Sequence, residues 1–468
     1  MGCYGAEQET SPHIDKMAEE GILFEKCYSC WNTTDQSLTS ILSGRYPRTH
    51  GIVHHGDKIT VDDLKIYKRL GIDLLGDLLR KNGYHTMAVD WMGRWYKRGF
   101  DFYGYKPDHN FIPNFFYHLF KLPYLHVKYM IDNIALLKIY SKKRKTSVRT
   151  NLKSLKGVLK TFRFTFELAR IQDAGYVTGL AEYLIRKRKD APFFLFLHYW
   201  DTHSPYNCPK KFMDYNKKQT PVDLYLSKYK GAVRYVDHHL GKIKEVLKDE
   251  DLLNNTLFII TSDHGESLTE HDIHFDHHGL YEATTHVPLI FYGPEIFREN
   301  KQIKSLIQHI DIVPTICDLL NIEKMPYDFD GFSLYPLFKD GKKELRDFIF
   351  NEESYVQRKI AIRNHKYKYI VAPDGKGYCN YCQKVHVGAE ELYDLTLDPE
   401  ETKNLVDLKK ELARDMKKQL ESFVSALDKK RDDGLKQKKD EIRPDKIMLD
   451  PEEEKKFRKR LRSLGYMD

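Results

Sequence analysis

Residues 259–266 read Ile-Ile-Thr-Ser-Asp-His-Gly-Glu, and this stretch decides the fold. It begins with the apolar composition of a buried strand, and two adjacent metal-binding side chains, Asp263 and His264, follow where that strand ends. Sites of α/β proteins lie at the carboxyl ends of sheet strands. A histidine-rich loop leads on to a second apolar run, and its imidazoles are His271, His274, His277 and His278. The stretch therefore predicts a strand that carries a site, whereas Asp-His-Gly on its own would equally suit a solvated turn.

Short apolar runs alternate with helical stretches along much of the chain, which is the pattern of a doubly wound α/β sheet. We expect helices on this sheet at residues 73–82 and 235–247. Arg80 and Lys81 in the last turn of the first helix, followed by Gly83, favour an end to that helix there. The expected strands are residues 86–89, 193–198, 257–261 and 287–291.

The composition changes in the C-terminal part of the chain. Alternating residues at 360–363 and 367–371 predict a small antiparallel sheet. Beyond Asn404 the chain is charged and expected to be helical, and few apolar residues remain there to pack it on the body. We therefore predict two parts, residues 1–339 and residues 340–468.

The bulk composition bounds the class of protein. At 468 residues the chain exceeds one ordinary domain, and 76 Lys and Arg against 68 Asp and Glu leave it only mildly basic. Its seven cysteines are odd in number and scattered, which argues against a disulfide framework and favours a cytoplasmic setting. We find no run of about 18 apolar residues and no signal peptide. Cys379 and Cys382, with His386 nearby, are weak evidence for zinc, and a loop with incidental thiols is the default.

An insertion is expected at about residues 110–174. Between Tyr117 and Asp173, 13 Lys and Arg stand against 3 Asp and Glu. One interpretation is a solvated helical excursion whose apolar face covers the body of the protein. The other is a surface for an anionic membrane, a polyanionic substrate or a partner chain, since basic amphipathic helices suit such surfaces. No nucleic-acid-binding module is present, so no nucleic acid partner is expected.

Several ordered segments resemble the sulfatase family within the alkaline phosphatase superfamily. TSDHGESLTEH at 261–271 and HHGLYEATTHVPLIFYGP at 277–294 are similar to its metal and substrate segment. The likeness covers nearly the whole chain, with GRYP at 44–47, DTHSPY at 201–206 and HIDIVPT at 309–315. It implies an alkaline phosphatase/sulfatase-like α/β fold, with a doubly wound, mostly parallel sheet and a smaller C-terminal α+β subdomain.

The family register places the nucleophile at Thr34, which would also contact the metal. Type I sulfatases carry there the first residue of C-x-P-S-R, and formylglycine forms from Cys or, in some members, Ser. No formylglycine is therefore expected, and direct attack by the Thr34 alkoxide is implied. The pattern of Thr34, Ser37, Ser40 and Gly44 looks closer to the threonine-type branch, which includes phosphoglycerol transferases and phosphodiesterases, although Gln36 replaces its proline. From local sequence alone, Thr34 could equally be a helix-capping hydroxyl.

The remaining roles follow from the same resemblance. Asp263 and His264 are the implied ligands of one divalent metal: the carboxylate suits Ca²⁺, Mg²⁺ or Mn²⁺, and the imidazole keeps Zn²⁺ in play. His203 and His277 match positions that contact the ester oxygens or the leaving group, so either is a candidate general acid and substrate-binding residue. Arg45 matches a substrate-binding arginine. Purely structural roles stay open for these last three residues.

The start of the sequence departs from the family pattern. Sulfatases begin with an apolar strand that supplies metal carboxylates just before Gly-Cys-Tyr-Gly, and here that tetrapeptide is residues 2–5. The resemblance implies that this strand is missing, which would expose the edges of its neighbours. We expect a metal-dependent sulfatase-like hydrolase that cleaves a sulfate ester or phosphate (di)ester of a small molecule, glycan or lipid. The alternative is a catalytically impaired protein that binds an anionic glycan, lipid or partner.

Overall fold

The computed structural model describes residues 1–90, 92–104, 173–206, 208–214, 216, 219–297, 300–322, 328–379, 385 and 387–438. The chain forms two compact units. The first comprises Met1–Met17 and Leu79–Thr256, and the second comprises Ala18–Leu78 and Leu257–Asp468. The predicted insertion lies outside the described residues except for its last two positions, and the predicted division after residue 339 stays a prediction.

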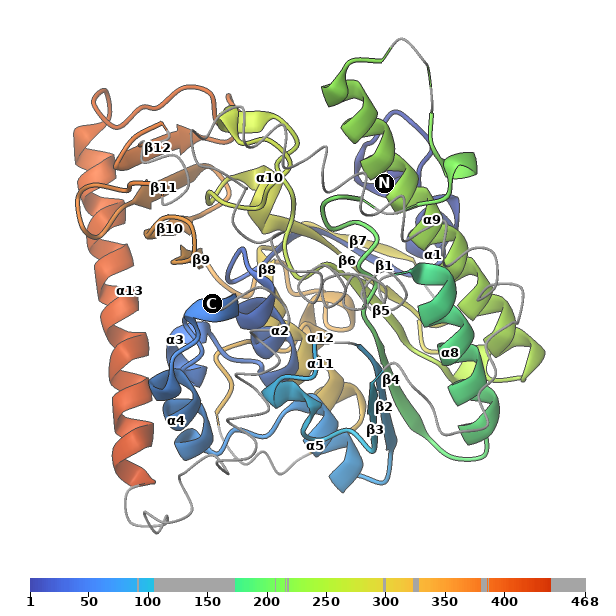
Figure 1. Cartoon of the computed structure of the whole chain (residues 1–468). Helices are drawn as coiled ribbons and strands as arrows, with labels where there is room; N and C mark the ends of the chain where they lie inside the picture. The colour runs from blue at the N-terminus through green and yellow to red at the C-terminus, as the bar shows by residue number, and fades with distance from the viewer. Residues whose placement is uncertain are drawn as a thin grey trace, which may run out of the picture. The chain divides into compact units, whose positions relative to one another are not determined.

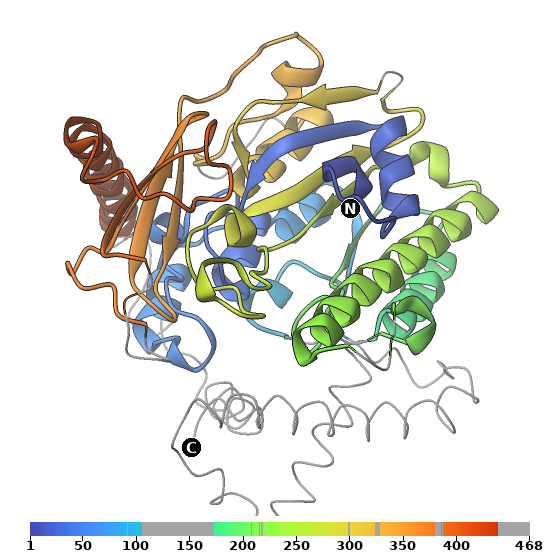
Figure 2. The same cartoon turned by 90° about the horizontal axis from the view of Figure 1, so that it is seen from above.

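A three-stranded parallel sheet organises the first unit. β2 (His85–Val89) is its central strand, flanked by β3 (Phe102–Gly104) and β4 (Phe193–Leu197). Because all three strands run in the same direction, their carboxyl ends meet at one edge of the sheet. The helices α8 (Ala174–Arg188) and α9 (Pro221–Asp249) lie side by side in this unit (Figure 2).

Both helices begin at capped ends. The Asp173 side chain accepts a hydrogen bond from the backbone of Tyr176, and Thr220 and Asp223 form a capping box around Pro221 at the first helical position. The apolar side of α8 then packs on the sheet. The core of this unit comprises Met87, Val89, Val177, Leu180 and Leu184, with Phe102, Phe193, Leu195 and Leu197 partly buried against them.

A five-stranded mixed sheet organises the second unit. Its strands are β1 (Ile22–Tyr28), β5 (Phe258–Thr261), β6 (His286–Tyr292), β7 (Lys301–Ile303) and β8 (Ile307–Gln308). β6 runs antiparallel between β5 and β1, whereas β7 and β8 both pair in parallel with β1. Within the described residues, β5 in this unit and β4 in the first are each edge strands.

Apart from α8, α9 and the C-terminal helix described below, the helices are short. They are α1 (Pro12–Glu20), α2 (Thr34–Ser43), α3 (Pro47–His50), α4 (Val61–Leu70), α5 (Leu75–Lys81), α10 (Glu282–Thr285), α11 (Ile312–Leu319) and α12 (Tyr335–Phe338). Single 3₁₀ turns lie at Gly2–Tyr4, Gly56–Lys58, Trp95–Lys97, Lys210–Phe212, Leu253–Asn255, Glu270–Asp272 and His309–Asp311. Among the helices of the described ranges, none is both long and apolar enough to span a membrane.

The C-terminal part of the second unit is a four-stranded antiparallel sheet. Its strands, in spatial order, are β12 (Glu390–Asp394), β11 (Tyr367–Val371), β10 (Lys359–Arg363) and β9 (Ile349–Glu353). The long helix α13 (Lys410–Gln437) lies along one face of this sheet (Figure 1).

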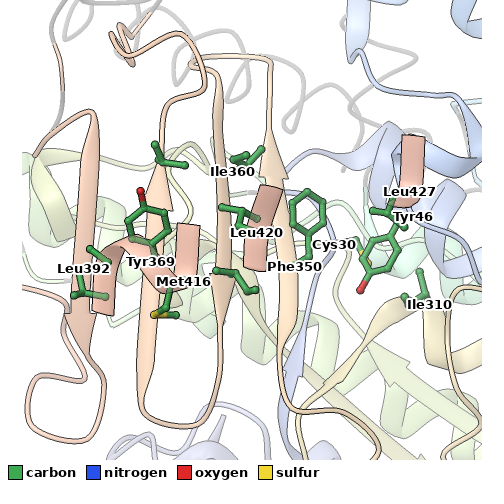
Figure 3. Close-up of a cluster of buried hydrophobic side chains, with 13 residues drawn as sticks. Cys30, Tyr46, Ile310, Phe350, Ile360, Tyr369, Leu392, Met416, Leu420 and Leu427 are labelled. Carbon is green, nitrogen blue, oxygen red and sulfur yellow. The ribbon is translucent and has the colours of Figure 1, made fainter. Parts of the chain in front are cut away.

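The expectation that few apolar residues pack the C-terminal helix on the body is wrong. Ala413, Met416, Leu420 and Leu427 of α13 are all buried, and their spacing puts them on one side of the helix. Figure 3 shows Met416 and Leu420 lying among Ile360, Tyr369 and Leu392 of the sheet. Leu412, Phe423 and Val424 of the same helix are partly buried against this cluster, so seven apolar residues of α13 pack there.

The predicted fold class is confirmed, with an α/β body that contains parallel strands and a C-terminal subdomain. The strands expected from the sequence appear as β2, β4, β5, β6, β10 and β11. The helix expected at 235–247 is the C-terminal half of the longer α9, and the charged region after Asn404 is helical over α13. The antiparallel direction of β6 was not evident from the sequence, because an apolar run does not reveal its direction.

Candidate active site

The turn after β5 presents Asp263 and His264 because a glycine follows them. The backbone N–H of Gly265 donates to the carbonyl of Thr284 at 2.9 Å. A Cβ at Gly265 would lie 2.2 Å from the carbonyl oxygen of Ala283, so no larger residue fits this approach of two backbone segments. The turn therefore holds the two candidate ligands at the carboxyl end of β5, as the sequence predicts.

Thr34 is the first residue of α2, and Thr33 before it is the N-cap residue. The Thr33 hydroxyl donates to Oε1 of Gln36 at 2.6 Å, so Gln36 secures the helix start where the family pattern has proline. The interpretation of Thr34 as a capping hydroxyl is wrong. Since α2 is buried along its whole length, the positive end of its dipole lies unscreened by solvent beside Thr34 and favours negative charge there.

The structure brings Thr34, Asp263, His264 and His277 together. Nε2 of His264 lies 3.4 Å from Oγ1 of Thr34 and 3.4 Å from Oδ2 of Asp263. The rings of His264 and His277 are 4.3 Å apart, centroid to centroid, and tilted by 35°. Thus segments separated by more than two hundred residues converge on one hydroxyl group.

Backbone carbonyls fix the tautomers of both imidazoles. Nδ1 of His264 lies 2.8 Å from the carbonyl oxygen of Gly265, and Nδ1 of His277 lies 2.6 Å from that of Asn32. A carbonyl can only accept, so each Nδ1 carries the proton. In the neutral rings the lone pair is therefore on Nε2, which in His264 faces the Thr34 hydroxyl.

A half-buried carboxylate, Asp276, directly precedes His277 and His278 in the chain. It accepts from the backbone N–H of His277 at 2.7 Å and lies 3.3 Å from Nδ1 of His278. Burial alone would raise the pKa of Asp276, but the hydrogen bond to His278 and the charge of His277 outweigh it and lower that pKa to about 2. Asp276 is thus ionised, which the sequence analysis did not anticipate.

Two further residues of the site were missed. Asn32 donates from Nδ2 to the carbonyl of Gly279 at 3.1 Å, while its buried Oδ1 has no hydrogen-bond partner within the described chain. Neither ring nitrogen of the fully buried His309 has such a partner among those residues, and burial lowers its pKa to about 4 against the opposing charge of Asp263. His309 is the first residue of HIDIVPT, a segment that resembles the sulfatase family, but the resemblance gave this histidine no role.

Two other predicted histidines have their recorded partners outside this cluster. The ring of His271 stacks on Tyr281 at 3.6 Å, and His274 pairs with Asp272 at an exposed position. Arg45 follows the last residue of α2 by one glycine and is buried. The burial of His50 lowers the pKa of that histidine most, and the charge of Arg45 lowers it further, to about 3. The substrate-binding role of Arg45 stays a prediction.

The histidine-rich loop ends on a buried network of charges. Glu282, at the start of α10, pairs with Arg363 at 2.9 Å and with Lys368 at 3.1 Å. Lys368, which is fully buried, also pairs with Glu401 at 2.8 Å. The two carboxylates share this lysine: burial and the charge of Glu282 raise the pKa of Glu401 to about 7, whereas the pKa of Glu282 falls to about 2, because Lys368 and Arg363 outweigh its burial.

His203 belongs to the first unit and lies in the loop after β4. Its Nδ1 is 2.8 Å from the carbonyl oxygen of Ser204, so it too carries the proton on Nδ1. Its ring is 5.2 Å from that of Trp200, and the peptide bond between Ser204 and Pro205 is cis. The predicted contact of His203 with the ester stays a prediction.

Comparison with known proteins identifies the family. The profile of the family described as Sulfatase matches residues 1–322. The chain belongs to the sulfatase family. A second profile, described as N-sulphoglucosamine sulphohydrolase, C-terminal, matches residues 269–428. The predicted family is thereby confirmed, whereas its threonine-type branch and the missing strand remain predictions.

Curated relatives and a solved structure agree with this assignment. The chain is 25% identical to an arylsulfatase of Clostridium perfringens, over 87% of each chain, and 26% identical to an N-acetylgalactosamine-6-O-sulfatase of Bacteroides thetaiotaomicron, over 90% of each. A protein solved in complex with its substrate D-glucosamine-2-N,6-O-disulfate superposes with a TM-score of 0.62 at 18% identity, covering 92% of this chain and 95% of that one. The prediction of a sulfatase-like hydrolase is confirmed at the level of the family.

The cluster fits a divalent ion only in part. Within the described ranges, no group of three or more His, Cys, Asp or Glu side chains could hold a metal. Asp263, His264 and the Thr34 hydroxyl nevertheless form a donor set of carboxylate, imidazole and hydroxyl. Their separations of 3.4 Å suit ligands at about 2.1 Å from a shared ion. The Nδ1 hydrogen bond of His264 also matches the outer hydrogen bond that metal-bound imidazoles make.

The predicted zinc motif falls largely outside the described residues. Cys379 is buried, whereas Cys382 and His386 are among the residues that the structure does not describe. The weak zinc hypothesis at this segment stays untested.

Proposed function

We propose that the protein hydrolyses a sulfate or phosphate ester carried by a glycan, with the Thr34 hydroxyl as nucleophile. The observation that carries the proposal is the 3.4 Å approach of Thr34 Oγ1 to Nε2 of His264. A hydroxyl beside an imidazole lone pair, at the amino end of a buried helix, is the arrangement of an activated nucleophile. The name of the relative that acts on N-acetylgalactosamine 6-O-sulfate supports a glycan substrate.

In the proposed reaction the bond from Thr34 Oγ1 to sulfur or phosphorus forms as the bond to the ester oxygen breaks. The Thr34 hydroxyl proton passes to solvent water, because the one lone pair of His264, on Nε2, is the pair that would hold the ion proposed below, and the leaving alcohol takes a proton from an imidazole. His277 in its protonated form is our candidate for that imidazole, because the Asn32 carbonyl holds its Nδ1–H and the added proton is therefore on Nε2, in a ring that lies against His264. Water then attacks the sulfur or phosphorus, which releases sulfate or phosphate and restores the Thr34 hydroxyl.

We further propose that Asp263 and His264 hold one divalent ion. Such an ion would neutralise the nonbridging oxygens of the ester and lower the pKa of the Thr34 hydroxyl. Because no group of three or more His, Cys, Asp or Glu side chains among the described residues could hold a metal, we infer that this pair binds the ion weakly.

The experiment compares two substitutions of Thr34 that differ in whether the hydroxyl group is kept. Thr34→Val removes the hydroxyl and keeps the volume of a side chain that is only 4% exposed, whereas Thr34→Ser keeps the hydroxyl. Each variant is assayed on 4-nitrophenyl sulfate, 4-nitrophenyl phosphate and bis(4-nitrophenyl) phosphate with added divalent metals. We expect Thr34→Val to lose at least about a thousandfold in kcat and Thr34→Ser to retain activity.

A covalent adduct would identify both the nucleophile and the substrate. Rapid acid quenching followed by accurate-mass peptide analysis should find a sulfo or phospho group on the peptide that contains Thr34. Wild-type turnover that survives in Thr34→Val would refute the nucleophile. Saturable binding of sulfated glycans without turnover of any ester by the wild type would instead favour the catalytically impaired binding protein.

A further inference from the structure

The backbone of Gly279 is held by three buried side chains, which come from three separate segments of the second unit. Its carbonyl accepts from the hydroxyl of Thr284 at 2.6 Å and from Nδ2 of Asn32 at 3.1 Å. Its N–H donates to Oε2 of Glu353 at 2.8 Å. A carbonyl has two lone pairs and an N–H has one proton, so every backbone hydrogen-bonding position of Gly279 is used.

The strand β9 places two of these side chains. Glu353 is the last residue of β9. The backbone N–H of Glu352 donates to the carbonyl of Cys30 at 3.1 Å, and Trp31 forms a parallel bridge with Glu352. The segment that carries Asn32 is therefore tied to the same strand, and the end of β9 determines where both side chains lie.

Asn32 also contacts the proposed general acid. Its backbone carbonyl accepts from Nδ1 of His277 at 2.6 Å, while its side chain holds Gly279, two residues further along the chain. Gly279 has a φ of +89°, a conformation that favours glycine, and a Cβ there would lie 2.7 Å from the ring of Tyr281. Asn32 thus holds the segment at two points, the ring of His277 and the turn that follows it.

Maintenance of the fold alone accounts poorly for an amide at position 32. Asn32 is fully buried, and its Oδ1 has no hydrogen-bond partner within the described part of the chain. An unsatisfied buried acceptor costs stability. The Gly279 carbonyl also accepts from the Thr284 hydroxyl, so it would stay paired without the amide. The Asn32 amide therefore restrains the segment while it adds little to the stability of the fold.

We propose that Asn32 and Glu353 are the residues that position His277 for proton transfer to the leaving alcohol. The Asn32 carbonyl holds the Nδ1 proton of the ring, and the two side chains fix the backbone of Gly279. Such restraint matters because misplacement of a reacting group by about 1 Å costs on the order of a hundredfold in rate. Both residues act through His277. The inference rests on the proposed function in taking His277 as the general acid.

The first readout is the position of the proton on His277, which requires no turnover. The His277 signal in the ¹⁵N spectrum of the full chain is identified by its loss in His277→Gln. In the neutral ring of the wild type it should show a protonated Nδ1. Asn32→Leu removes the amide and keeps the branched shape of the side chain. We expect this variant to show a mixture of the two tautomers, because the Asn32 carbonyl is no longer tied to the segment that carries the ring.

The second readout compares two leaving groups. The steady-state constants kcat and KM are measured on the 4-nitrophenyl and phenyl esters of sulfate and of phosphate. Phenol is a weaker acid than 4-nitrophenol, so its release depends more on a well-placed proton donor. We expect Asn32→Leu to lower kcat about tenfold on the 4-nitrophenyl ester and about a hundredfold on the phenyl ester, with KM changed less than about twofold. A merely structural role would lower kcat equally on both esters.

Asn404→Leu is the matched control. Nδ2 of Asn404 donates to the backbone carbonyl of Glu390 at 3.1 Å, the same distance as from Asn32 to Gly279. This variant should be less stable in urea, because two backbone N–H groups lose their acceptor, but it should change neither the ring signal nor the ratio of kcat between the esters. Glu353 provides a second comparison. Glu353→Met should behave as Asn32→Leu does, whereas Glu353→Gln keeps an acceptor oxygen and should recover most of the lost kcat.

The outcomes separate this inference from the proposed function. A mixture of tautomers in Asn32→Leu or Glu353→Met, in a chain that turns over no ester, would uphold the positioning of His277 and refute the hydrolase. Ester turnover together with a wild-type ring signal in both variants would refute the positioning and uphold the hydrolase. If Asn32→Leu does not fold, the Glu353 pair decides, and equal kcat values for Glu353→Met and Glu353→Gln on the phenyl ester would overturn the inference.

Discussion

Substituting Gly265 by alanine should separate the geometry of the site from its chemistry. The added Cβ would lie 2.2 Å from the carbonyl oxygen of Ala283, whereas real Cβ contacts essentially never fall below 3.0 Å, so a displacement of about 0.8 Å must be taken up. The φ angle of Gly265 is not in the left-handed region, so the clash is the whole effect. No side chain can yield, because both segments in contact are backbone.

The displacement would move residue 265, whose carbonyl accepts the hydrogen bond from His264. Since the carbonyl of Gly265 fixes Nδ1 of that imidazole at 2.8 Å, a shift of this size moves Nε2 away from Thr34 by a similar distance. Misplacement of a reacting group by about 1 Å costs on the order of a hundredfold in rate. Overpacking of this kind also costs about 1–3 kcal/mol of stability.

The assay compares kcat/KM for 4-nitrophenyl esters and urea unfolding of Gly265→Ala with those of the wild type. Gly179→Ala is the matched control, because Gly179 lies inside α8 and an added Cβ there would meet nothing within 4 Å. That control should be fully active and at least as stable as the wild type. Wild-type activity in Gly265→Ala would refute the argument that this glycine positions the site.

Three further predictions concern stability and metal binding. Because the folded chain keeps a proton on Glu401 up to about pH 7 that the unfolded chain loses near 4.5, stability falls across this window. In urea unfolding, Glu401→Gln should therefore gain up to about 3 kcal/mol relative to wild type between pH 5 and pH 8, whereas the exposed Glu400→Gln should show no such trend. Divalent metals at about 10⁻⁴–10⁻³ M should raise the Tm of the wild type but not that of Asp263→Asn. An equal rise in both proteins at every pH tested would exclude Asp263 as a metal ligand. Leu420→Ala should lose about 2–5 kcal/mol because Leu420 of α13 is fully buried against the C-terminal sheet, while Leu397→Ala, at an 84% exposed position, should lose nothing measurable by the same unfolding assay.

Much of the fold could be predicted from the sequence because its signals are local. The apolar runs that became β2, β4, β5 and β6 are short and bounded by polar residues, so their length and composition suffice. Two features depend on distant partners and could not be predicted. One is the antiparallel direction of β6, and the other is the buried side of α13, whose apolar residues find partners on the four-stranded sheet of β9 to β12.

The sequence predicts the chemistry of the candidate site but only some of the residues that form it. Asp263 and His264 were found by looking for polar residues directly after an apolar strand. The same rule applied to the strand at 86–89 would have found Asp90, the buried carboxylate that pairs with His198, whereas His198 itself falls inside the strand expected at 193–198 and follows β4 only because β4 ends at Leu197. Asn32 carries no such signal, because an amide after a buried strand is ordinary until its unsatisfied oxygen is seen in three dimensions.

The tautomers of the four imidazoles show where the limit of sequence reasoning lies. His264 and His203 each donate from Nδ1 to the carbonyl of the very next residue, so the chain itself encodes which nitrogen is left to react. His277 and His198 reach the same state through acceptors 245 and 108 residues away. When neutral, each of the four rings keeps its lone pair on Nε2, although two depend on tertiary structure to do so. A substitution that breaks only long-range contacts should therefore change the tautomers of His277 and His198 before those of His264 and His203. The ¹⁵N imidazole spectra of a destabilised variant can test this.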